Sequence, residues 1–166
     1  MKQEYTSKET SINSSKLPAI YKVLAKHDYI ADCSILDYGC GRFTDHISAF
    51  AMKEGASSWD GADKYNQSPA HNEEVLSKTY DVAVLSNVVN VIKEEQIIAD
   101  IIDDCLQHAP VCFISVYEGD KTGIGKATQG GKSWQRNQKK ADYIEMLENM
   151  GFIVNKWHGV IAVTFG

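Results

Sequence analysis

The stretch Ser34-Ile35-Leu36-Asp37-Tyr38-Gly39-Cys40-Gly41-Arg42 decides how the rest of the chain is interpreted. Its apolar beginning predicts a short buried strand, and its two glycines predict a tight turn that leads into a helix. Glycine lets a backbone approach a bulky ligand closely, and the first turn of a helix offers unpaired N–H groups. The stretch therefore predicts a strand, a ligand-binding turn and a helix, in that order.

The acidic residue Asp37 indicates which kind of ligand this turn would bind. Dinucleotide-binding turns carry the pattern Gly-x-Gly-x-x-Gly, whereas the pattern here is Asp37-x-Gly39-x-Gly41. A carboxylate at the end of a strand favours a positively charged ligand group over a pyrophosphate. S-adenosylmethionine (SAM), which carries an ammonium and a sulfonium, fits better than NAD. A tight turn that binds no ligand is the alternative interpretation.

Length and composition predict one globular domain without a metal. The chain has 166 residues, of which 43% are hydrophobic and 23% charged, and no apolar run approaches the length of a membrane helix. The polar N-terminus shows no signal peptide, so we expect a cytoplasmic protein. The four cysteines lack Cys-x-x-Cys spacing and the five histidines are scattered. We therefore expect reduced thiols and no structural metal. The cysteines are Cys33, Cys40, Cys105 and Cys112.

Alternating elements predict an α/β fold with a doubly wound, mostly parallel, Rossmann-like sheet and a C-terminal antiparallel hairpin. Residues 1–15 are expected to form a flexible arm and residues 16–166 one domain, with Ser15 as N-cap of the first helix. The predicted helices span residues 16–27, 44–54, 94–108 and 140–150, with a small one around 73–77. The predicted strands span residues 34–38, 57–62, 81–85, 111–117, 152–157 and 160–165.

This layout resembles the class I SAM-dependent methyltransferases, in particular the small methyltransferase-domain proteins of phages and bacteria. The glycine turn carries the resemblance, and the stretches 86–92 and 117–120 are also similar to that subgroup. The resemblance implies a methyltransferase with SAM as its cofactor. It also implies a departure, because the link between Asp63 and Tyr80 is too short for a full third strand and its helix. The residues that bind adenine therefore stay unassigned.

The resemblance implies a set of cofactor-binding residues. The turn would line the methionine and ribose side of SAM, and Asp63 would accept the ribose hydroxyls, with Asp60 as the alternative. Ser86 and Asn87 would lie beside the methionine portion. The implied cofactor-binding residues are Asp37, Gly39, Cys40, Gly41, Asp63, Lys64, Ser86 and Asn87.

Catalysis of methyl transfer mainly requires alignment, and a base is needed only if the acceptor loses a proton. The residues Asn87, Asn90, Tyr117 and Glu118 fall at the C-terminal ends of predicted strands, where such sheets bind ligands. The catalytic candidates among them are Asn87, Tyr117 and Glu118. Helix capping is the alternative role for Asn90, and a solvated loop acid is the alternative for Glu118. Neither an Asn-Pro-Pro-Tyr nor a Pro-Cys motif occurs, which argues against the common DNA methyltransferases.

A basic segment in an acidic chain predicts an anionic acceptor. The net charge is −5, yet segment 119–140 contains six basic residues and one acidic residue. We expect it to lie over the pocket mouth and to bind a nucleotide, a nucleic acid or a phosphorylated small molecule. A mobile surface loop is the alternative. The substrate-binding candidates are Lys126, Lys132, Trp134 and Arg136. A SAM-binding protein without activity and a nucleic-acid-binding module remain rival functions.

Overall fold

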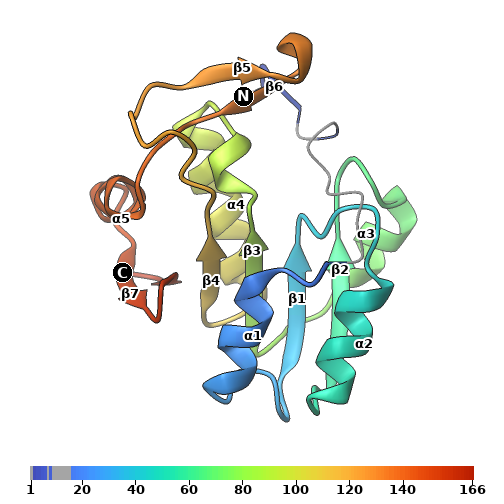
Figure 1. The fold of residues 1–166 in the computed structure, drawn as a ribbon. Helices are drawn as coiled ribbons and strands as arrows, with labels where there is room; N and C mark the ends of the chain where they lie inside the picture. Colours follow the sequence, from blue (N-terminus) through green and yellow to red (C-terminus); the bar gives the residue numbers. More distant parts are fainter. Residues whose placement is uncertain (1, 7, 9–15) are drawn as a thin grey trace.

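The computed structural model describes residues 2–6, 8 and 16–166, and its centre is a six-stranded sheet of order β2-β1-β3-β4-β8-β7 (Figure 1). The first four strands pair in parallel, and β8 and β7 add two antiparallel pairings. This arrangement confirms the predicted fold class. The strands are β1 (Ser34–Tyr38), β2 (Ser58–Ala62), β3 (Val82–Ser86), β4 (Cys112–Ser115), β7 (Ile153–Trp157) and β8 (Val160–Thr164).

The five α-helices of the described residues cover both faces of the sheet (Figure 1). One core cluster holds side chains of α1 and α2, and the other holds side chains of α3, α4 and α5. Strand β3 is buried along almost its whole length between these layers, as expected of a central parallel strand. The helices are α1 (Ala19–Lys26), α2 (Asp45–Lys53), α3 (Pro69–Val75), α4 (Glu95–His108) and α5 (Lys140–Asn149). None of the helices in the described residues has the length and apolar character needed to cross a membrane.

Two helix starts differ from the prediction. Helix α1 begins at Ala19, with Pro18 in the N-cap position, and the predicted cap Ser15 lies outside the described residues. A proline disfavours helical geometry in the residue before it, so the helix starts after Pro18. The small helix expected around residues 73–77 is α3, which starts at Pro69 because the Ser68 side chain accepts a hydrogen bond from the His71 N–H.

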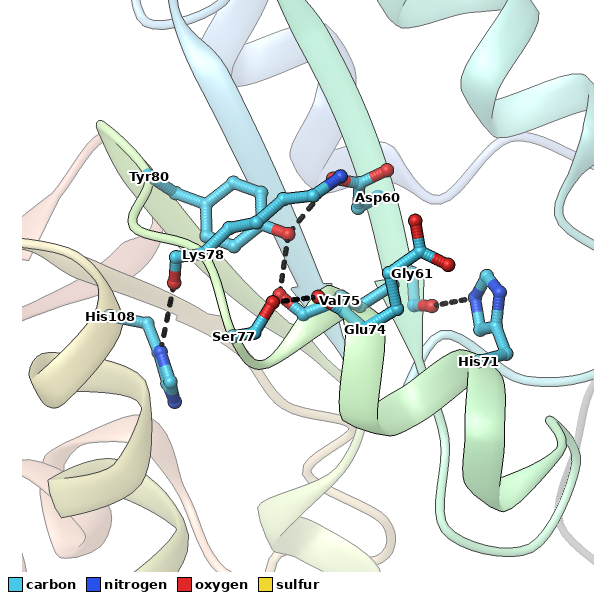
Figure 2. A network of polar contacts seen from close by, with 9 residues as sticks. All are labelled: Asp60, Gly61, His71, Glu74, Val75, Ser77, Lys78, Tyr80 and His108. Carbon is cyan, nitrogen blue, oxygen red and sulfur yellow. Dashed lines mark hydrogen bonds and ion pairs between the residues drawn. The ribbon is translucent and has the colours of Figure 1, made fainter.

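The link between β2 and β3 contains α3 and no strand in its fully described residues 63–81, which confirms the reduced third strand. Polar contacts fasten this link to β2 (Figure 2). The Tyr80 hydroxyl oxygen lies within hydrogen-bond distance of two acceptors, 2.9 Å from Asp60 Oδ2 and 2.8 Å from the Val75 carbonyl oxygen. The His71 ring nitrogen Nε2 lies 2.8 Å from the Gly61 carbonyl oxygen. These bonds hold α3 and the chain that follows it against β2.

The basic segment, predicted as a long loop without periodicity, contains a small hairpin. Strands β5 (Lys126–Thr128) and β6 (Ser133–Gln135) pair antiparallel around a short 3-10 turn, Gln129–Gly131. Figure 1 shows the hairpin above the edge of the sheet where the parallel strands end, beside the N-terminal residues. The sequence predicts that the basic segment lies over the pocket mouth at this edge, and the position of the hairpin is consistent with that prediction.

Candidate functional site

A cavity of about 580 Å³ lies at the carboxyl ends of β1, β2 and β3. Its polar side comes from the turns that follow these three strands, at residues 39–41, 63–66 and 86–88. Its apolar side comes from Val91, Ile92 and the α4 residues Ile97 and Ile101. This edge is where ligands bind in parallel α/β sheets. The cavity therefore offers one polar and one apolar wall to the same molecule.

The glycine turn packs against the segment that follows β3. Gly39 has a φ of +81°, and a Cβ atom there would lie 2.7 Å from Cγ2 of Val88. Its N–H donates to the Ala62 carbonyl at 2.7 Å, which ties the turn to the end of β2. Only glycine satisfies both the backbone conformation and the close approach, so the motif is required by the local packing.

Asp37 is a buried carboxyl group, 1% exposed, that lines the cavity. The Tyr21 hydroxyl donates to its Oδ2 and itself accepts from Nε1 of Trp59 at 2.9 Å, whereas Asp37 Oδ1 has no partner in the described residues. Burial raises the pKa of Asp37 to about 7, although the Tyr21 hydrogen bond opposes the shift, and nearby Asp63 adds to it. A cation bound beside this carboxyl would favour its ionised form.

Asp63 connects two of the turns. Its Oδ2 accepts from the Gly41 N–H at 2.8 Å, and its Oδ1 accepts from the N–H groups of Tyr65 at 2.9 Å and Asn66 at 3.0 Å. Oδ1 also lies 3.2 Å from the Asn66 amide nitrogen. A carboxylate has about four acceptor positions, so Oδ2 keeps room for one further donor. The prediction from the sequence is that Asp63 accepts both ribose hydroxyls.

Asp60, the alternative ribose ligand, serves a different purpose. Its Oδ2 accepts from the Tyr80 hydroxyl at 2.9 Å and lies 3.5 Å from the Lys78 ammonium (Figure 2). Asp60 is not among the cavity residues, whereas Asp63 is. Of the two carboxylates considered from the sequence, the structure thus brings only Asp63 to the cavity.

The remaining predicted site residues fall into two groups. Cys40, Lys64, Ser86 and Asn87 line the cavity, and Asn87 has a φ of +55° that its N–H bond to the Ser115 carbonyl helps to fix.

The second group of predicted site residues lies outside the cavity lining. Tyr117 is 62% exposed, and the Glu118 carboxylate accepts from the Lys140 N–H at 2.9 Å, at the start of α5. Asn90 is buried behind the cavity, and its carbonyl accepts from the Arg136 N–H.

Arg136 is 8% exposed and its guanidinium is occupied by the protein itself. It donates to the carbonyls of Ile92 at 3.1 Å and Lys93 at 2.8 Å, and it lies 3.6 Å from Glu95. Arg136 therefore anchors the basic segment to the chain that precedes α4. Of the other basic-segment candidates, Lys126 pairs with Asp120 at 3.3 Å and Lys132 is exposed.

Several residues that lie at the site were not identified as site residues from the sequence. Tyr21 has the helical spacing of a core residue, and nothing in that pattern indicates its bond to Asp37. Gln3 lines the cavity and Tyr5 stacks on Trp134, although both belong to the predicted flexible arm. The Lys93 ammonium lies beside this pair, 5.6 Å from the centre of the Tyr5 ring and 4.9 Å from that of Trp134, in cation–π contact with each. Such contacts join residues far apart in the sequence, so no local signal could have revealed them.

No family model and no curated protein matches the sequence. Solved structures do match. A 1,6-didemethyltoxoflavin-N1-methyltransferase from Burkholderia thailandensis, crystallised with S-adenosylhomocysteine (SAH), is 16% identical, with a TM-score of 0.60 over 87% of this chain and 76% of that one. Magnesium protoporphyrin IX methyltransferase from Synechocystis with bound SAM is 13% identical, with a TM-score of 0.55 over 89% and 77%.

A SAM-dependent methyltransferase from Mesorhizobium loti matches over 92% of this chain and 98% of its own length, with a TM-score of 0.52 and 13% identity. At these identities the likeness establishes the fold, which is that of the class I SAM-dependent methyltransferases. The resemblance inferred from the glycine turn and the order of elements is thereby confirmed at the level of the fold.

Proposed function

We propose that the protein binds SAM in the cavity and transfers its methyl group to an anionic acceptor. The observation that carries this proposal is the cavity itself, on a methyltransferase fold. It joins a glycine turn, the open side of Asp63 and the Oδ1 atom of Asp37, which has no hydrogen-bond partner within the described part of the chain. Bound SAM would supply a methyl group on a sulfonium, already activated for displacement. The protein then has to bind the cofactor and the acceptor, orient them toward each other and exclude water from the cavity.

The residues present fit such a cofactor. Asp37 would balance the positive charge of the methionine portion, and the Gly39 backbone would let that portion approach closely. Asp63 Oδ2 would accept one ribose hydroxyl, and Ser86 would lie beside the methionine portion. The adenine ring would contact Leu76 and the residues Ile97 and Ile101 of the apolar side. These side chains would replace residues that a full third strand would provide.

Asn87 is the candidate for orienting the reacting groups. It lines the cavity, and its left-handed backbone conformation is fixed by the sheet neighbour Ser115. Tyr117 and Glu118 remain candidates for a base, although they would have to approach the cavity from outside its lining. An acceptor that needs no strong base to lose its proton suits this arrangement.

The acceptor would meet the protein at the hairpin β5–β6 and its flanks. Lys126 and Lys132 would attract an anion, and Trp134 would stack on a ring, while Arg136 would hold the hairpin in place. A nucleotide or a nucleic acid combines both features. The cytoplasmic location and the phage or bacterial origin stay predictions from the sequence.

Labelled methyl transfer tests the proposal directly. The protein would be incubated with methyl-labelled SAM and, separately, with nucleoside monophosphates and short oligonucleotides, and SAH formation would be measured. We expect label in one acceptor class and, with SAM at saturating concentration, a loss of at least tenfold in rate for Asn87→Ala. SAM binding without transfer to any anionic acceptor would instead support a non-catalytic SAM-binding protein, the alternative that the outlying positions of Tyr117 and Glu118 favour.

A further inference from the structure

The N-terminal residues Gln3, Glu4 and Tyr5, called the N-terminal strap below, extend across the mouth of the cavity. On one side, Gln3 lines the cavity and its Oε1 accepts from the Tyr65 hydroxyl at 3.1 Å. On the other side, the Glu4 N–H donates to Glu94 at 2.8 Å. The strap thus bridges the turn after β2 and the segment before α4. Figure 1 shows these residues beside the β5–β6 hairpin, above the ends of the parallel strands.

The strap contacts the groups that an anionic, ring-bearing acceptor would use. The Tyr5 ring stacks on Trp134 with centroids 5.2 Å apart and an interplanar angle of 28°. The Glu4 carboxylate lies 2.8 Å from the Lys93 ammonium, which is also 4.9 Å from the centre of the Trp134 ring. The Tyr5 ring therefore already covers a face of the Trp134 indole, and the neighbouring Glu4 carboxylate already pairs with the Lys93 ammonium.

The contacts that hold the strap are weak enough to be exchanged. The Lys93 and Glu4 side chains are 40% and 56% exposed, and ion pairs at such positions contribute little to stability. Two buried polar atoms at the strap, Gln3 Nε2 and Glu94 Oε2, have no partner among the described residues. An unpaired buried polar group is costly, so a ligand that satisfies these atoms would gain from replacing or extending the contact.

We propose that the N-terminal strap occupies the acceptor site in the absence of acceptor, with Tyr5 in the place of a planar ring and Glu4 in the place of an anionic group. The acceptor then stacks on Trp134 and pairs with Lys93, as the base and phosphate of a nucleotide would. This inference rests on the proposed function and specifies which side chains the acceptor would contact. It also adds Lys93, which lies outside the basic segment, to the acceptor site.

Competition between strap and acceptor is measurable by calorimetry. The unaltered protein and its Glu4→Gln/Tyr5→Ala variant would each be titrated in the presence of SAH. The titrants would be the four nucleoside monophosphates, the matching nucleosides, inorganic phosphate and a short oligonucleotide. If the strap closes the site, the apparent affinity equals the intrinsic affinity multiplied by the fraction of molecules in which the strap is open. We expect at least one monophosphate or the oligonucleotide to bind the variant about tenfold more tightly, equivalent to about 1.4 kcal/mol.

Two further variants make the result specific. Lys2 is exposed and makes no hydrogen bond or ion pair with the described residues, so Lys2→Ala should bind like the unaltered protein. Lys93→Ala in the strap variant should abolish the gain, because it removes the phosphate partner. A larger gain for the oligonucleotide than for the monophosphates would identify a nucleic acid as the source of the nucleotide.

The outcomes separate this inference from the function on which it rests. Equal or weaker binding of every probe by the strap variant, with SAH bound normally, would overturn the strap proposal and leave the cofactor assignment intact. A gain for phosphate alone would overturn the role of the ring. Absence of SAH binding to the unaltered protein would instead overturn the proposed function itself.

Discussion

Replacing Asp37 by asparagine should make the protein more stable at alkaline pH. Burial raises the pKa of Asp37 from its usual 3.8 to about 7, so the folded protein binds a proton that the unfolded chain has already lost. Stability contributed by this group therefore falls as the pH rises from about 4 to 7. At 1.36 kcal/mol per pKa unit, the loss is about 4 kcal/mol in total and about 3 kcal/mol between pH 5 and pH 8. The asparagine side chain carries no such charge, and its oxygen can still accept from Tyr21.

Urea denaturation of the two proteins at pH 5 and pH 8, followed by tryptophan fluorescence, measures this effect. All other titrating groups are shared, so the difference in unfolding free energy between variant and unaltered protein isolates Asp37. We expect the variant to gain stability relative to the unaltered protein by about 3 kcal/mol on going from pH 5 to pH 8. The same difference at both pH values would refute the account of a buried, unpaired carboxyl.

The same carboxyl should make cofactor binding depend on pH. A ligand ammonium beside Asp37 favours the ionised form, so the proton has to leave when SAH binds below pH 7. Affinity for SAH should then decrease as the pH falls from 7 to 5, by up to about tenfold per pH unit. Asp37→Asn should bind more weakly and lose this pH dependence.

Three other substitutions test the packing around the site. Gly39→Ala should destabilise the fold by about 2 kcal/mol and weaken SAH binding at least tenfold, because its φ is +81° and its Cβ would lie 2.7 Å from Val88. Gly123→Ala, with a φ of +77° and nothing near its Cβ, is the matched control and should leave SAH binding unchanged. Arg136→Met should lower unfolding free energy by about 2 kcal/mol, since two carbonyls lose their donor; unchanged stability in urea would contradict this anchor role. Tyr80→Phe should cost about 1 kcal/mol in thermal denaturation by releasing α3 from β2.

The central part of the fold was predictable because its local signals agree with its tertiary structure. The apolar run at residues 81–85 and the glycine turn after Tyr38 each define an element without help from distant residues. The hairpin β5–β6 was not predictable, because its strands, Lys126–Thr128 and Ser133–Gln135, have three residues and one apolar side chain each, too few to form a repeating pattern. It is held instead by long-range contacts, such as the Arg136 bonds to the chain before α4.

The candidate site divides in the same way. Asp37 lies near the end of β1 and Asp63 directly follows β2, so their positions at the cavity could be anticipated. Tyr117 also follows a strand, but β4 ends at Ser115 and the chain then turns outward, which leaves this ring 62% exposed. The roles of Tyr21 and Lys93 depend on neighbours distant in sequence. Sequence patterns therefore identify groups fixed by local geometry, whereas groups fixed by packing require the structure.

Calorimetric titration with SAH of the unaltered protein, Asp63→Asn and the matched control Asp60→Asn tests the central claim most directly. Both variants keep side-chain size, and only Asp63 lines the cavity. We predict micromolar binding by the unaltered protein and by Asp60→Asn, and binding at least tenfold weaker for Asp63→Asn with the protein still folded by thermal denaturation. No binding to the unaltered protein, or the same loss in both variants, would contradict the assignment of this cavity to SAM.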